Sequence, residues 1–526
     1  MVATASPHAS DAAQAVAHAG GNAIDAAVAA AWALAVCEPS ASGLGGQTLM
    51  LIRLASGRTV VVDGHSRAPA AASRAAVSRA QQRAGYRAAS VPTTPATLAH
   101  AQRRFGRLPA ARTIEPAIRL AEEGYPISPL QRRQLRWCRT TLAATPGGRR
   151  YLRPDGRPHR AGAVFRQEAL AGALRRIAEH GVEDFYEGAI GHAIDADMRR
   201  NDGVLTGSDL AAVRAPAERE PLTATYRGRI VMTVPPPGGG VELLVGLKLL
   251  EELAADGAYG PQDPWHLCLA EATFLAFQER ERRPVHPDEW TAELGERLLS
   301  PERARGLAAS RNRPGAAWGP EAEEAGETTH LCTADEDGNV VSLTQSIQSL
   351  FGAKVANATF GFLYNNYLAT CPRRRHPYRL RGLAPVRSNA APTLVAEPAG
   401  PGSPARPVLA LGGAGSRRIV SAVMHVVSGV LDRGLSLDQA LAAPRVHPRL
   451  SGRIWVERPA AGAELLAALA GRFRGVDLRA AHSYAMGAVQ AIEFREDGTA
   501  AGGADPRRDG VALALAGEPG SGRAAA

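Results

Sequence analysis

Two adjacent threonines, Thr328 and Thr329, stand where a polar segment rich in proline and glycine, residues 284–326, gives way to residues typical of a β-strand. A threonine in this position can attack the carbonyl carbon before it, cleave the chain and become a new N-terminus. Its freed α-amino group, with an ordinary pKa of about 7.7–8.0, can then act as general base for the threonine hydroxyl. This chemistry needs neither a histidine nor a metal ion. The same residues are also typical of a plain strand, and the pattern alone leaves both interpretations open.

A glycine-rich loop, residues 411–418, is the second place where residue types point to chemistry. It lies between a predicted strand and a predicted helix, where backbone N–H groups at the start of the helix can stabilise an oxyanion during acyl transfer. A dinucleotide-binding loop is disfavoured, because Arg418 stands where that motif needs its third glycine and no strand-end acid follows about twenty residues later. A tight turn without chemistry remains an alternative.

The elements that must position these residues follow from the spacing of the apolar side chains. Residues 11–36 have helical character interrupted by two glycines, and Asn22 is a suitable N-cap for the second helix. Residues 48–54 and 59–62 are rich in β-formers and joined by a short turn, which predicts a hairpin. Residues 96–257 are mostly helical in pattern.

The rest of the chain has a different character. A break at residues 235–240 precedes a further helix, residues 284–326 read as a long surface segment and the one compositional boundary, and residues 505–526 read as a loosely ordered tail. Strands alternating with helical layers predict an α/β layered fold. The β-rich runs are 328–333, 339–344, 362–364, 392–395, 408–411 and 490–494, and the helix after the glycine-rich loop is 418–431.

Composition excludes several function classes. The 526 residues include 61 Lys and Arg against 51 Asp and Glu, a net charge of +10, yet the only lysines are Lys248 and Lys354. Neither lysine sits in a phosphate-binding loop, and a pyridoxal enzyme would have to use one of them. The arginines are interspersed with acids, as at residues 280–283, so we interpret their excess as composition and expect no nucleic-acid partner.

Cysteine usage and targeting signals indicate a soluble protein. The five cysteines are dispersed and odd in number, which argues against a disulfide framework and a structural zinc site and fits a reducing compartment. The start of the chain lacks the pattern of a signal peptide, and the longest apolar run, residues 26–37, is too short to span a bilayer. We therefore expect a cytoplasmic protein without membrane contact, metal or organic cofactor.

Motifs in order along nearly the whole chain resemble the γ-glutamyltransferase family of N-terminal nucleophile hydrolases. Each motif is modest alone, but their order and spacing are specific. The first part matches at residues 20–29, 43–46, 115–118, 184–188 and 235–237, and the later part at 328–330, 337–339, 443–445 and 505–507.

This resemblance implies an αββα sandwich made as one precursor. Thr328 would attack the carbonyl of Glu327 and divide the chain into a large region, residues 1–327, and a small region, residues 328–526, which would remain together as a heterodimer of one αββα domain. The α-amino group of Thr328 would serve as base. An acyl-enzyme on Thr328 would then pass its acyl group to water or to an amine.

The resemblance also implies roles for other residues. Ser346 falls where the family places a hydroxyl that supports the nucleophile, and Gly415 and Ser416 fall on the paired glycines of the oxyanion hole. The second of these is tolerable as serine only if the backbone there does not require a positive φ. Asn365 and Asn366 match a pair near the substrate pocket.

The residues expected to bind the charged head group of a γ-glutamyl substrate differ here from those of the family. The family's carboxylate-binding arginine is replaced by His65, with Arg67 two positions later, and the acid that pairs with the α-amino group is replaced by Thr370. A zwitterionic ligand needs a charged partner at each end, because an unpaired buried charge is costly. The other altered pocket positions are Tyr367, Gln348, Ser388 and Asn389.

The sequence therefore predicts a self-processing hydrolase or acyltransferase that cleaves an amide or related acyl bond of a small molecule. The altered clamp favours a substrate other than glutathione, as in acylases or in family members that cleave carbon–carbon bonds in antibiotic biosynthesis. A homologue without catalysis, acting as a binding protein, is the alternative from another class.

Two further side chains, His330 and Cys332, would lie on the same strand face as Thr328, because strand side chains alternate. His330 could tune the amine, but we interpret it as a core histidine with a satisfied ring. We interpret Cys332 as a small buried side chain, and not as a nucleophile.

Overall fold

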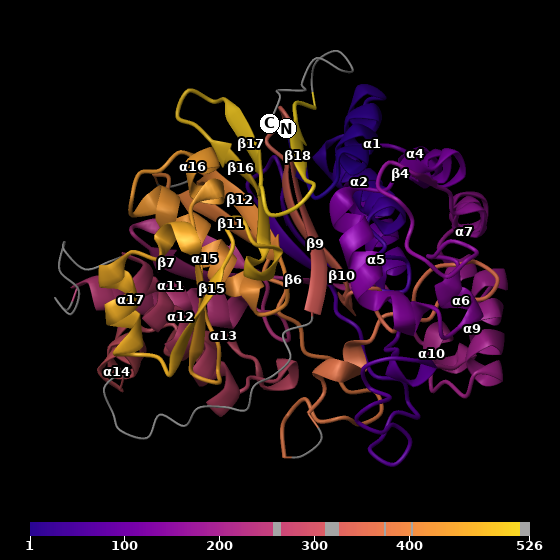
Figure 1. Ribbon diagram of the computed structural model, residues 1–526. Helices are drawn as coiled ribbons and strands as arrows, with labels where there is room; N and C mark the ends of the chain where they lie inside the picture. Colours follow the sequence, from indigo (N-terminus) through magenta and orange to yellow (C-terminus); the bar gives the residue numbers. More distant parts are fainter. Residues whose placement is uncertain (256–264, 311–325, 373–374, 401–402, 516–526) are drawn as a thin grey trace. The chain divides into compact units, whose positions relative to one another are not determined.

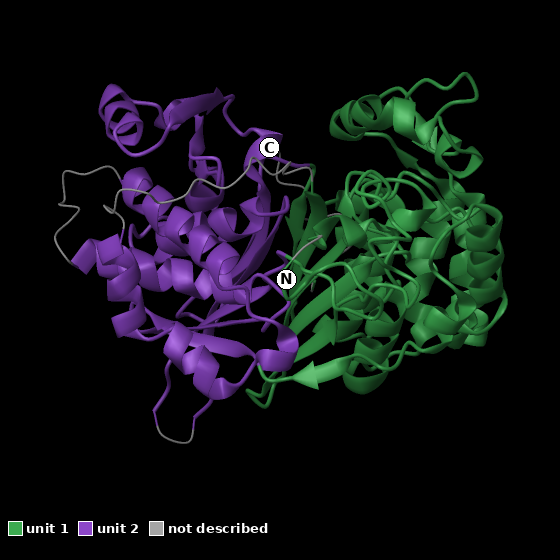
Figure 2. Cartoon of the chain, turned by 90° about the horizontal axis from the view of Figure 1, so that it is seen from below, with its two compact units in different colours: residues 1–220, 326–388, 509–526 green, residues 221–325, 389–508 purple. Residues whose placement is uncertain are grey.

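The computed structural model describes residues 1–255, 265–310, 326–372, 375–400 and 403–515. The chain divides into two compact units, coloured separately in Figure 2. Unit 1 comprises residues 1–220, 326–388 and 509–526, and unit 2 comprises residues 221–325 and 389–508. Each unit combines residues from both sides of the Glu327–Thr328 bond.

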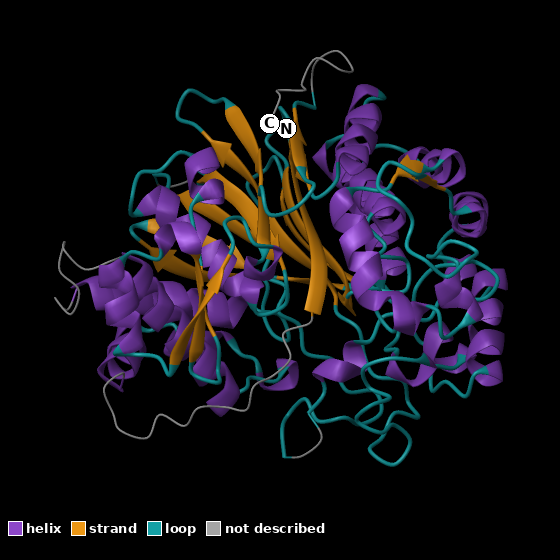
Figure 3. Cartoon of the chain, in the orientation of Figure 1, coloured by secondary structure: helices purple, strands orange, loops and turns teal. Residues whose placement is uncertain are grey.

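Unit 1 is built around a seven-stranded sheet with the order β18-β1-β9-β10-β2-β3-β6. Helices pack against this sheet, so the described elements fit the expected α/β class (Figure 3). The strands of the sheet are β1 (Val2–Thr4), β2 (Gln47–Arg53), β3 (Thr59–Gly64), β6 (Ala217–Arg219), β9 (Gly326–Ala334), β10 (Val340–Ser349) and β18 (Val511–Leu513). A small ribbon pairs β4 (Tyr125–Pro126) with β5 (Val164–Phe165).

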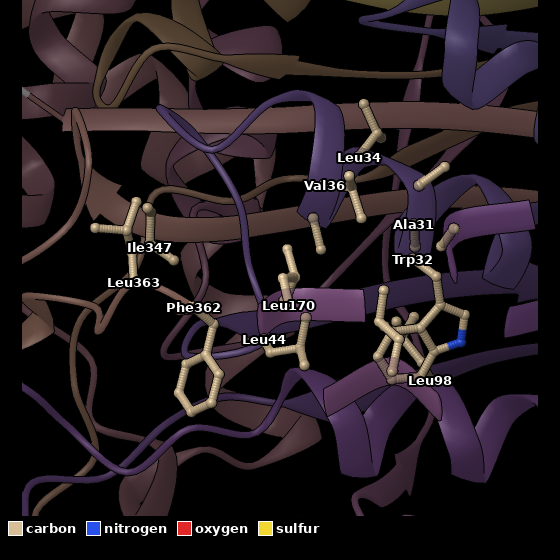
Figure 4. Packing of buried hydrophobic residues seen from close by; sticks show 14 of the residues in the cluster. Ala31, Trp32, Leu34, Val36, Leu44, Leu98, Leu170, Ile347, Phe362 and Leu363 are labelled. Atoms are coloured by element: carbon tan, nitrogen blue, oxygen red, sulfur yellow. The ribbon is translucent and has the colours of Figure 1, made fainter. Parts of the chain in front are cut away.

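The central helix of unit 1, α2 (Ala23–Cys37), is buried along its whole length and packs on β9 and β10. Its alanine-rich surface permits close approach to the sheet, and Trp32 and Leu34 lie in the same apolar cluster as Leu44 and Ile347 (Figure 4). The other helices of unit 1 are α1 (Pro7–His18), α3 (Thr94–Phe105), α4 (Ala110–Glu123), α5 (Pro129–Leu142), α6 (Pro146–Arg149), α7 (Glu168–His180), α8 (Glu183–Tyr186), α9 (Ala189–Arg200), α10 (Gly207–Ala211) and the 3₁₀ turns η1 (Tyr86–Ala88) and η4 (Tyr367–Thr370).

Unit 2 has a six-stranded sheet with the order β17-β16-β12-β11-β8-β7 and a smaller sheet of β13, β14 and β15 (Figure 1). Its strands are β7 (Leu222–Tyr226), β8 (Arg229–Thr233), β11 (Thr393–Glu397), β12 (Arg406–Ala414), β13 (Val446–Pro448), β14 (Arg453–Glu457), β15 (Gly475–Arg479), β16 (Ala488–Phe494) and β17 (Ala500–Ala504). Its helices are α11 (Gly240–Ala255), α12 (Trp265–Arg282), α13 (Ala292–Leu298), α14 (Pro301–Ala309), α15 (Arg418–Leu431), α16 (Leu437–Ala442), α17 (Ala463–Ala470) and the 3₁₀ turns η2 (Pro287–Glu289), η5 (Arg458–Ala460) and η6 (Tyr484–Met486).

Several predicted elements are confirmed. Asn22 caps α2 in a full capping box with Asp25, and β2 pairs with β3 as an antiparallel hairpin. The helix after the glycine-rich loop spans 418–431 as predicted, and α11 begins at the end of the 235–240 break.

The segment 284–326, predicted as a long surface segment or mobile loop, does lie largely at the surface in its described part, but it is not a loop. It contains α13 and α14, whose N-caps are Thr291 and Ser300, and both cap side chains accept hydrogen bonds from the first helical turn. The prediction rested on the proline and glycine content of the segment, whereas the N-cap hydrogen bonds of Thr291 and Ser300 determine the local structure. Residues 311–325 lie outside the described part of the chain. The predicted β-rich run 362–364 forms only isolated bridges.

The predicted loose tail 505–526 is also wrong where the structure describes it. Asp505 and Arg507 are buried and join Arg445 and Glu457 in a network of ion pairs inside unit 2. Burial alone would raise the pKa of Asp505, but Arg445 and Arg507 hold it below its ordinary value. In unit 1, β18 pairs with β1. Residues 516–526 are outside the described part.

Two other features differ from the sequence interpretation. The hairpin β7–β8 lies inside a region predicted to be mostly helical. The arginines are also less evenly spread than expected, since residues 129–166 hold ten arginines and one acid. Much of this charge lies on the exposed face of α5, at Arg132, Arg133, Arg136 and Arg139. No helix in the described residues is long and apolar enough to cross a membrane.

Candidate active site

Thr328 lies in β9 opposite an irregularity of β10. Gln345 pairs with Thr329 and Gln348 pairs with Glu327, so two residues of β10 face the single residue Thr328. This is a β-bulge, which re-aims side chains and occurs often beside active sites. It explains how a nucleophile can sit within a regular sheet and still meet a side chain of the neighbouring strand.

The Ser346 hydroxyl, inside this bulge, connects Thr328 to the carbonyl group before it. Thr328 Oγ1 donates to Ser346 Oγ at 3.2 Å, and Ser346 Oγ donates to the Glu327 carbonyl oxygen at 2.8 Å. The backbone N–H of Gln348 also donates to Ser346 Oγ, at 2.9 Å. Ser346 Oγ thus links the Thr328 hydroxyl, the Glu327 carbonyl and the Gln348 N–H group in one hydrogen-bonded group.

The surroundings of Thr328 are buried and largely uncharged. Thr328 is 6% exposed, and its N–H donates to Glu327 Oε1 at 3.2 Å. His330 is fully buried, its Nδ1 lies 2.9 Å from Thr344 Oγ1, and burial lowers its pKa to about 3. Burial raises the pKa of Cys332 far above its usual range, so the thiolate does not form. The interpretation of His330 and Cys332 as core side chains is confirmed.

In unit 2, the loop after β12 presents two adjacent backbone N–H groups. Within the described residues, the N–H groups of Gly415 and Ser416 donate no hydrogen bond, whereas the carbonyls of both residues accept from the first turn of α15. A pair of free N–H groups beside a helix start is what an oxyanion hole requires. Asn389 Nδ2 donates to Ser416 Oγ at 3.3 Å, and Arg280 donates to Asn389 Oδ1 at 2.6 Å.

Ser416 has φ +60°, so the backbone does adopt the left-handed region that we expected serine to avoid. Serine here costs about 1 kcal/mol relative to glycine. Gly415 has φ +119°, and a Cβ there would lie 3.0 Å from the backbone of Gly487. The loop therefore keeps the conformation of a glycine pair although one glycine is missing.

The Tyr367 side chain closes the polar region around Ser346 in unit 1. It is 2% exposed, and burial raises its pKa to about 12, with hydrogen bonds from Ser346, Ser388 and Gln47 acting in the opposite direction. Gln47 pairs with Ser346 across β2 and β10. Tyr367 is thus a neutral hydrogen-bonding group next to the Ser346 hydroxyl.

The two asparagines predicted to bind substrate are occupied by the protein itself. Asn365 Nδ2 donates to the carbonyls of Gly45 and Ser90, and its Oδ1 accepts from Ser90 and from the N–H of Tyr367. Asn366 Nδ2 donates to the Arg83 carbonyl and to Ser349 Oγ. No amide hydrogen of either side chain is left for a ligand, so both act as braces for the segment that carries Tyr367.

Three other predicted pocket residues have defined positions in unit 1. Gln348 ends the bulge with φ +82°. Thr370 Oγ1 donates to the Tyr367 carbonyl inside its own turn, so it replaces a charged group with an internally satisfied hydroxyl. The exposed Arg67 donates to the Leu383 carbonyl at 3.3 Å.

His65, directly after β3, belongs to a charged group that the sequence interpretation missed. Its Nδ1 lies 2.5 Å from Asp63 Oδ1, and Asp63 Oδ2 accepts from Arg219 at 2.7 Å. Burial alone would raise the pKa of Asp63, but His65 and Arg219 outweigh it and keep this carboxylate ionised. The i, i+2 spacing of Asp63 and His65 was visible in the sequence, whereas Arg219 comes from the distant strand β6.

The described residues group as follows. Unit 1 brings together Thr328, Ser346, Gln348, Tyr367 and Ser388, and unit 2 brings together Gly415, Ser416 and Asn389. Within the described residues, no group of three or more His, Cys, Asp or Glu side chains is arranged to hold a metal ion. The chemistry available is that of hydroxyls and backbone N–H groups.

Comparison with known proteins gives a consistent picture. The acylase ACY 1 proenzyme of Pseudomonas sp. (strain V22) is 35% identical over 98% of this chain and 94% of its own length. The glutathione hydrolase proenzyme of Escherichia coli is 30% identical over 93% of this chain and 87% of its own length. A cephalosporin acylase from Bacillus halodurans has a similar structure, with a TM-score of 0.87 and 29% identity over 98% of this chain and 96% of that one. The γ-glutamyltranspeptidase family model matches residues 9–515, and the chain therefore belongs to the γ-glutamyltranspeptidase family.

Proposed function

We propose that this protein is a self-processing amide hydrolase of the acylase type, with Thr328 as its nucleophile. The observation that carries the proposal is the pair of hydrogen bonds from Thr328 Oγ1 to Ser346 Oγ and from Ser346 Oγ to the Glu327 carbonyl oxygen. They align a hydroxyl nucleophile and a hydrogen-bond donor on the same peptide group. The proenzyme names of similar proteins support self-processing.

Self-cleavage begins when Thr328 Oγ attacks the Glu327 carbonyl carbon and gives up its proton. Negative charge develops on the carbonyl oxygen, where the Ser346 hydroxyl already donates a hydrogen bond. The C–N bond then breaks, the nitrogen of Thr328 takes up a proton, and an ester joins Glu327 to Thr328 Oγ. Water hydrolyses the ester, leaving a carboxylate on Glu327 and a free amine and hydroxyl on Thr328.

Turnover repeats the same attack on an external substrate. The α-amino group of Thr328 accepts the hydroxyl proton, an acyl-enzyme forms on Oγ, and the leaving amine takes the proton. The resemblance to the family assigns the oxyanion hole to Gly415 and Ser416, whose backbone N–H groups donate to no described group of unit 2. Water or an acceptor amine then releases the acyl group, in a double displacement.

The acyl donor is proposed to be other than a γ-glutamyl compound. In unit 1, the expected carboxylate clamp is His65 held by Asp63, and the expected ammonium partner is Thr370 with its hydroxyl satisfied internally. An ammonium group would therefore lack a charged partner at Thr370. The similarity to acylases over nearly the whole chain supports an acyl amide of a small molecule as substrate.

The two products, residues 1–327 and 328–526, are proposed to form a stable heterodimer with the αββα architecture of the family. The seven-stranded and the six-stranded sheet each mix strands from both products, since β10 of the small region pairs with β2 of the large one, and β11 pairs with β8. Neither product retains either of these two sheets complete by itself. Separation would expose strand edges and apolar faces, which is costly.

Denaturing electrophoresis of the purified protein tests the nucleophile. In proportion to residue number, cleavage of the 55.1 kDa chain yields fragments of about 34 and 21 kDa. Thr328→Ala is expected to remain uncleaved. Thr329→Ala is the matched control, because Thr329 Oγ1 is buried without a hydrogen-bond partner among the described residues, and this variant is expected to cleave like the wild type. A folded wild-type chain that never cleaves, or a Thr328→Ala variant that does, would refute the proposal.

Hydrolysis then distinguishes an enzyme from a binding protein. Processed wild-type protein is expected to release amine from acyl amides, and Thr328→Ala is expected to release none. A processed protein that turns over no acyl amide would indicate a binding homologue. Efficient turnover of a γ-glutamyl anilide, equal to that of the best acyl amide, would contradict the proposed substrate class.

A further inference from the structure

His65 presents a buried ring nitrogen that nothing in the protein uses. Its side chain is 6% exposed, Nδ1 is bound to Asp63, and Nε2 has no hydrogen-bond partner among the described residues. Buried polar atoms are nearly always paired, so an orphan of this kind needs an explanation. A ligand atom that bonds to Nε2 would complete the pair, an inference that rests on the function proposed above.

The sheet of unit 1 places His65 in the same row as the nucleophile. Thr328 faces Ser346 across the bulge, and Ser346 pairs with Gln47. Thr48 pairs with Gly64, so the next pair in this antiparallel register is Gln47 with His65. Three strand spacings of about 4.8 Å put the row at about 14 Å from end to end, and residues directly opposite one another share a face of the sheet.

The row is also continuous in polarity. The Tyr367 hydroxyl lies next to Ser346 and Gln47, in the middle of the row, and Gln47 Oε1 accepts from the N–H of Ser66, the residue after His65.

The charges around His65 decide which kind of atom Nε2 accepts. Asp63 is an anion already paired with Arg219, so a proton on both ring nitrogens would leave a net positive charge in a buried site. Asp63 accepts a hydrogen bond, which places the single ring proton on Nδ1. Nε2 is then a lone-pair acceptor. The side chain of the nearby Arg67 is exposed and bonded to Leu383.

We propose that His65, oriented by Asp63, is a specificity-determining residue that accepts a hydrogen bond from an N–H or O–H group at the far end of the acyl donor. The site selects donors that carry a carboxamide, amine or hydroxyl at this position. A carboxylate has only lone pairs to offer to Nε2, so the same site rejects it. An arginine here would make the opposite choice.

Two matched substrates test this assignment: glutaryl-4-nitroanilide and its counterpart with the terminal carboxylate replaced by a carboxamide, neither of which carries the ammonium group that would lack a partner at Thr370. For processed wild-type enzyme at pH 8, kcat/KM for the carboxamide is expected to exceed that for the carboxylate by at least about 10-fold, since sites built to pair a donor reject analogues that lack it. His65→Arg is expected to reverse the ratio. Asp63→Asn removes the carboxylate that fixes the ring proton and is expected to bring the ratio close to one.

Binding constants of the two compounds, measured by calorimetry, give the same ratio without depending on the nucleophile. This separates the inference from the proposed function, since loss of self-cleavage would refute the function while the binding ratio still tests His65. Self-cleavage of each variant reports that it folds, and His65→Gln serves if His65→Arg does not. A wild-type ratio of one or below, a ratio unchanged in every folded variant, or binding of neither compound would overturn the inference.

Discussion

Replacing Ser346 by alanine tests the arrangement that supports Thr328 most directly. The substitution removes the hydroxyl that donates to the Glu327 carbonyl oxygen, and it also removes the acceptor for Thr328 Oγ1. Loss of one preorganised donor to a developing oxyanion slows acyl transfer by about 100- to 1000-fold, which corresponds to about 3–4 kcal/mol. We therefore expect Ser346→Ala to self-cleave at least about 100-fold more slowly than the wild type.

The assay is a time course of precursor and fragments on denaturing gels, started from freshly purified protein. Ser342→Ala is the matched control, because Ser342 is buried on the same face of β10 four residues earlier, where its hydroxyl lies near His330. It is expected to cleave at the wild-type rate. Ser346→Thr retains a hydroxyl and is expected to recover most of the rate.

The result is informative in both directions. If Ser346→Ala cleaves as fast as the wild type while folded, the hydrogen bond from Ser346 to Glu327 does not stabilise the transition state, and the relay is incidental. If Ser342→Ala is slowed equally, the effect is a general loss of packing in β10. Only a selective loss in Ser346→Ala, with recovery in Ser346→Thr, fits the proposed chemistry.

Three further predictions concern stability, each measured by chemical denaturation of the uncleaved Thr328→Ala chain. Arg507→Met should lower the free energy of unfolding by about 3–5 kcal/mol, because it leaves the buried carboxylates of Glu457 and Asp505 without their ion pair to Arg507. An effect below about 1 kcal/mol would contradict this. Ser416→Gly should be more stable than Ser416→Ala by about 1 kcal/mol, because only glycine adopts φ +60° without strain; equal stability would argue against the left-handed conformation. The pKa of His330 is about 3 in the folded chain and about 6.5 in the unfolded chain. Between these two values only the unfolded chain takes up a proton at His330, so the free energy of unfolding should fall by about 1.4 kcal/mol per pH unit from pH 6.5 toward pH 3. His330→Gln should flatten that slope, and an unchanged slope would count against a neutral buried ring.

Local signals in the sequence were sufficient for much of the framework. Asn22 with Asp25, the turn between β2 and β3, and the bounds of α15 are determined by neighbouring residues, and all were predictable. The errors arose where distant residues decide. The segment 505–515 reads as polar and irregular, yet Arg445 and Glu457 bury its charges by pairing with them.

The candidate site shows the same division. Residue types and motif order were enough to single out Thr328, Ser346 and the glycine-rich loop. The sequence could not indicate that a bulge places two residues of β10 opposite Thr328, because register is a property of the strand pair. It also could not indicate that the Asn365 side-chain amide donates hydrogen bonds to the carbonyls of Gly45 and Ser90, because these partners lie hundreds of residues away in the sequence.

The bulge and the His65 group together suggest how catalysis and specificity are separated in this protein. The proposed catalytic relay depends on a backbone irregularity in β9 and β10 and on hydroxyl groups of the protein. The selection of the acyl group depends on His65 and Asp63, which lie after or within β3 and contact neither partner of the relay in the described structure. A change at position 65 can therefore alter the substrate without weakening self-cleavage. Self-cleavage that survives His65→Arg while substrate preference reverses would demonstrate this separation in a single variant.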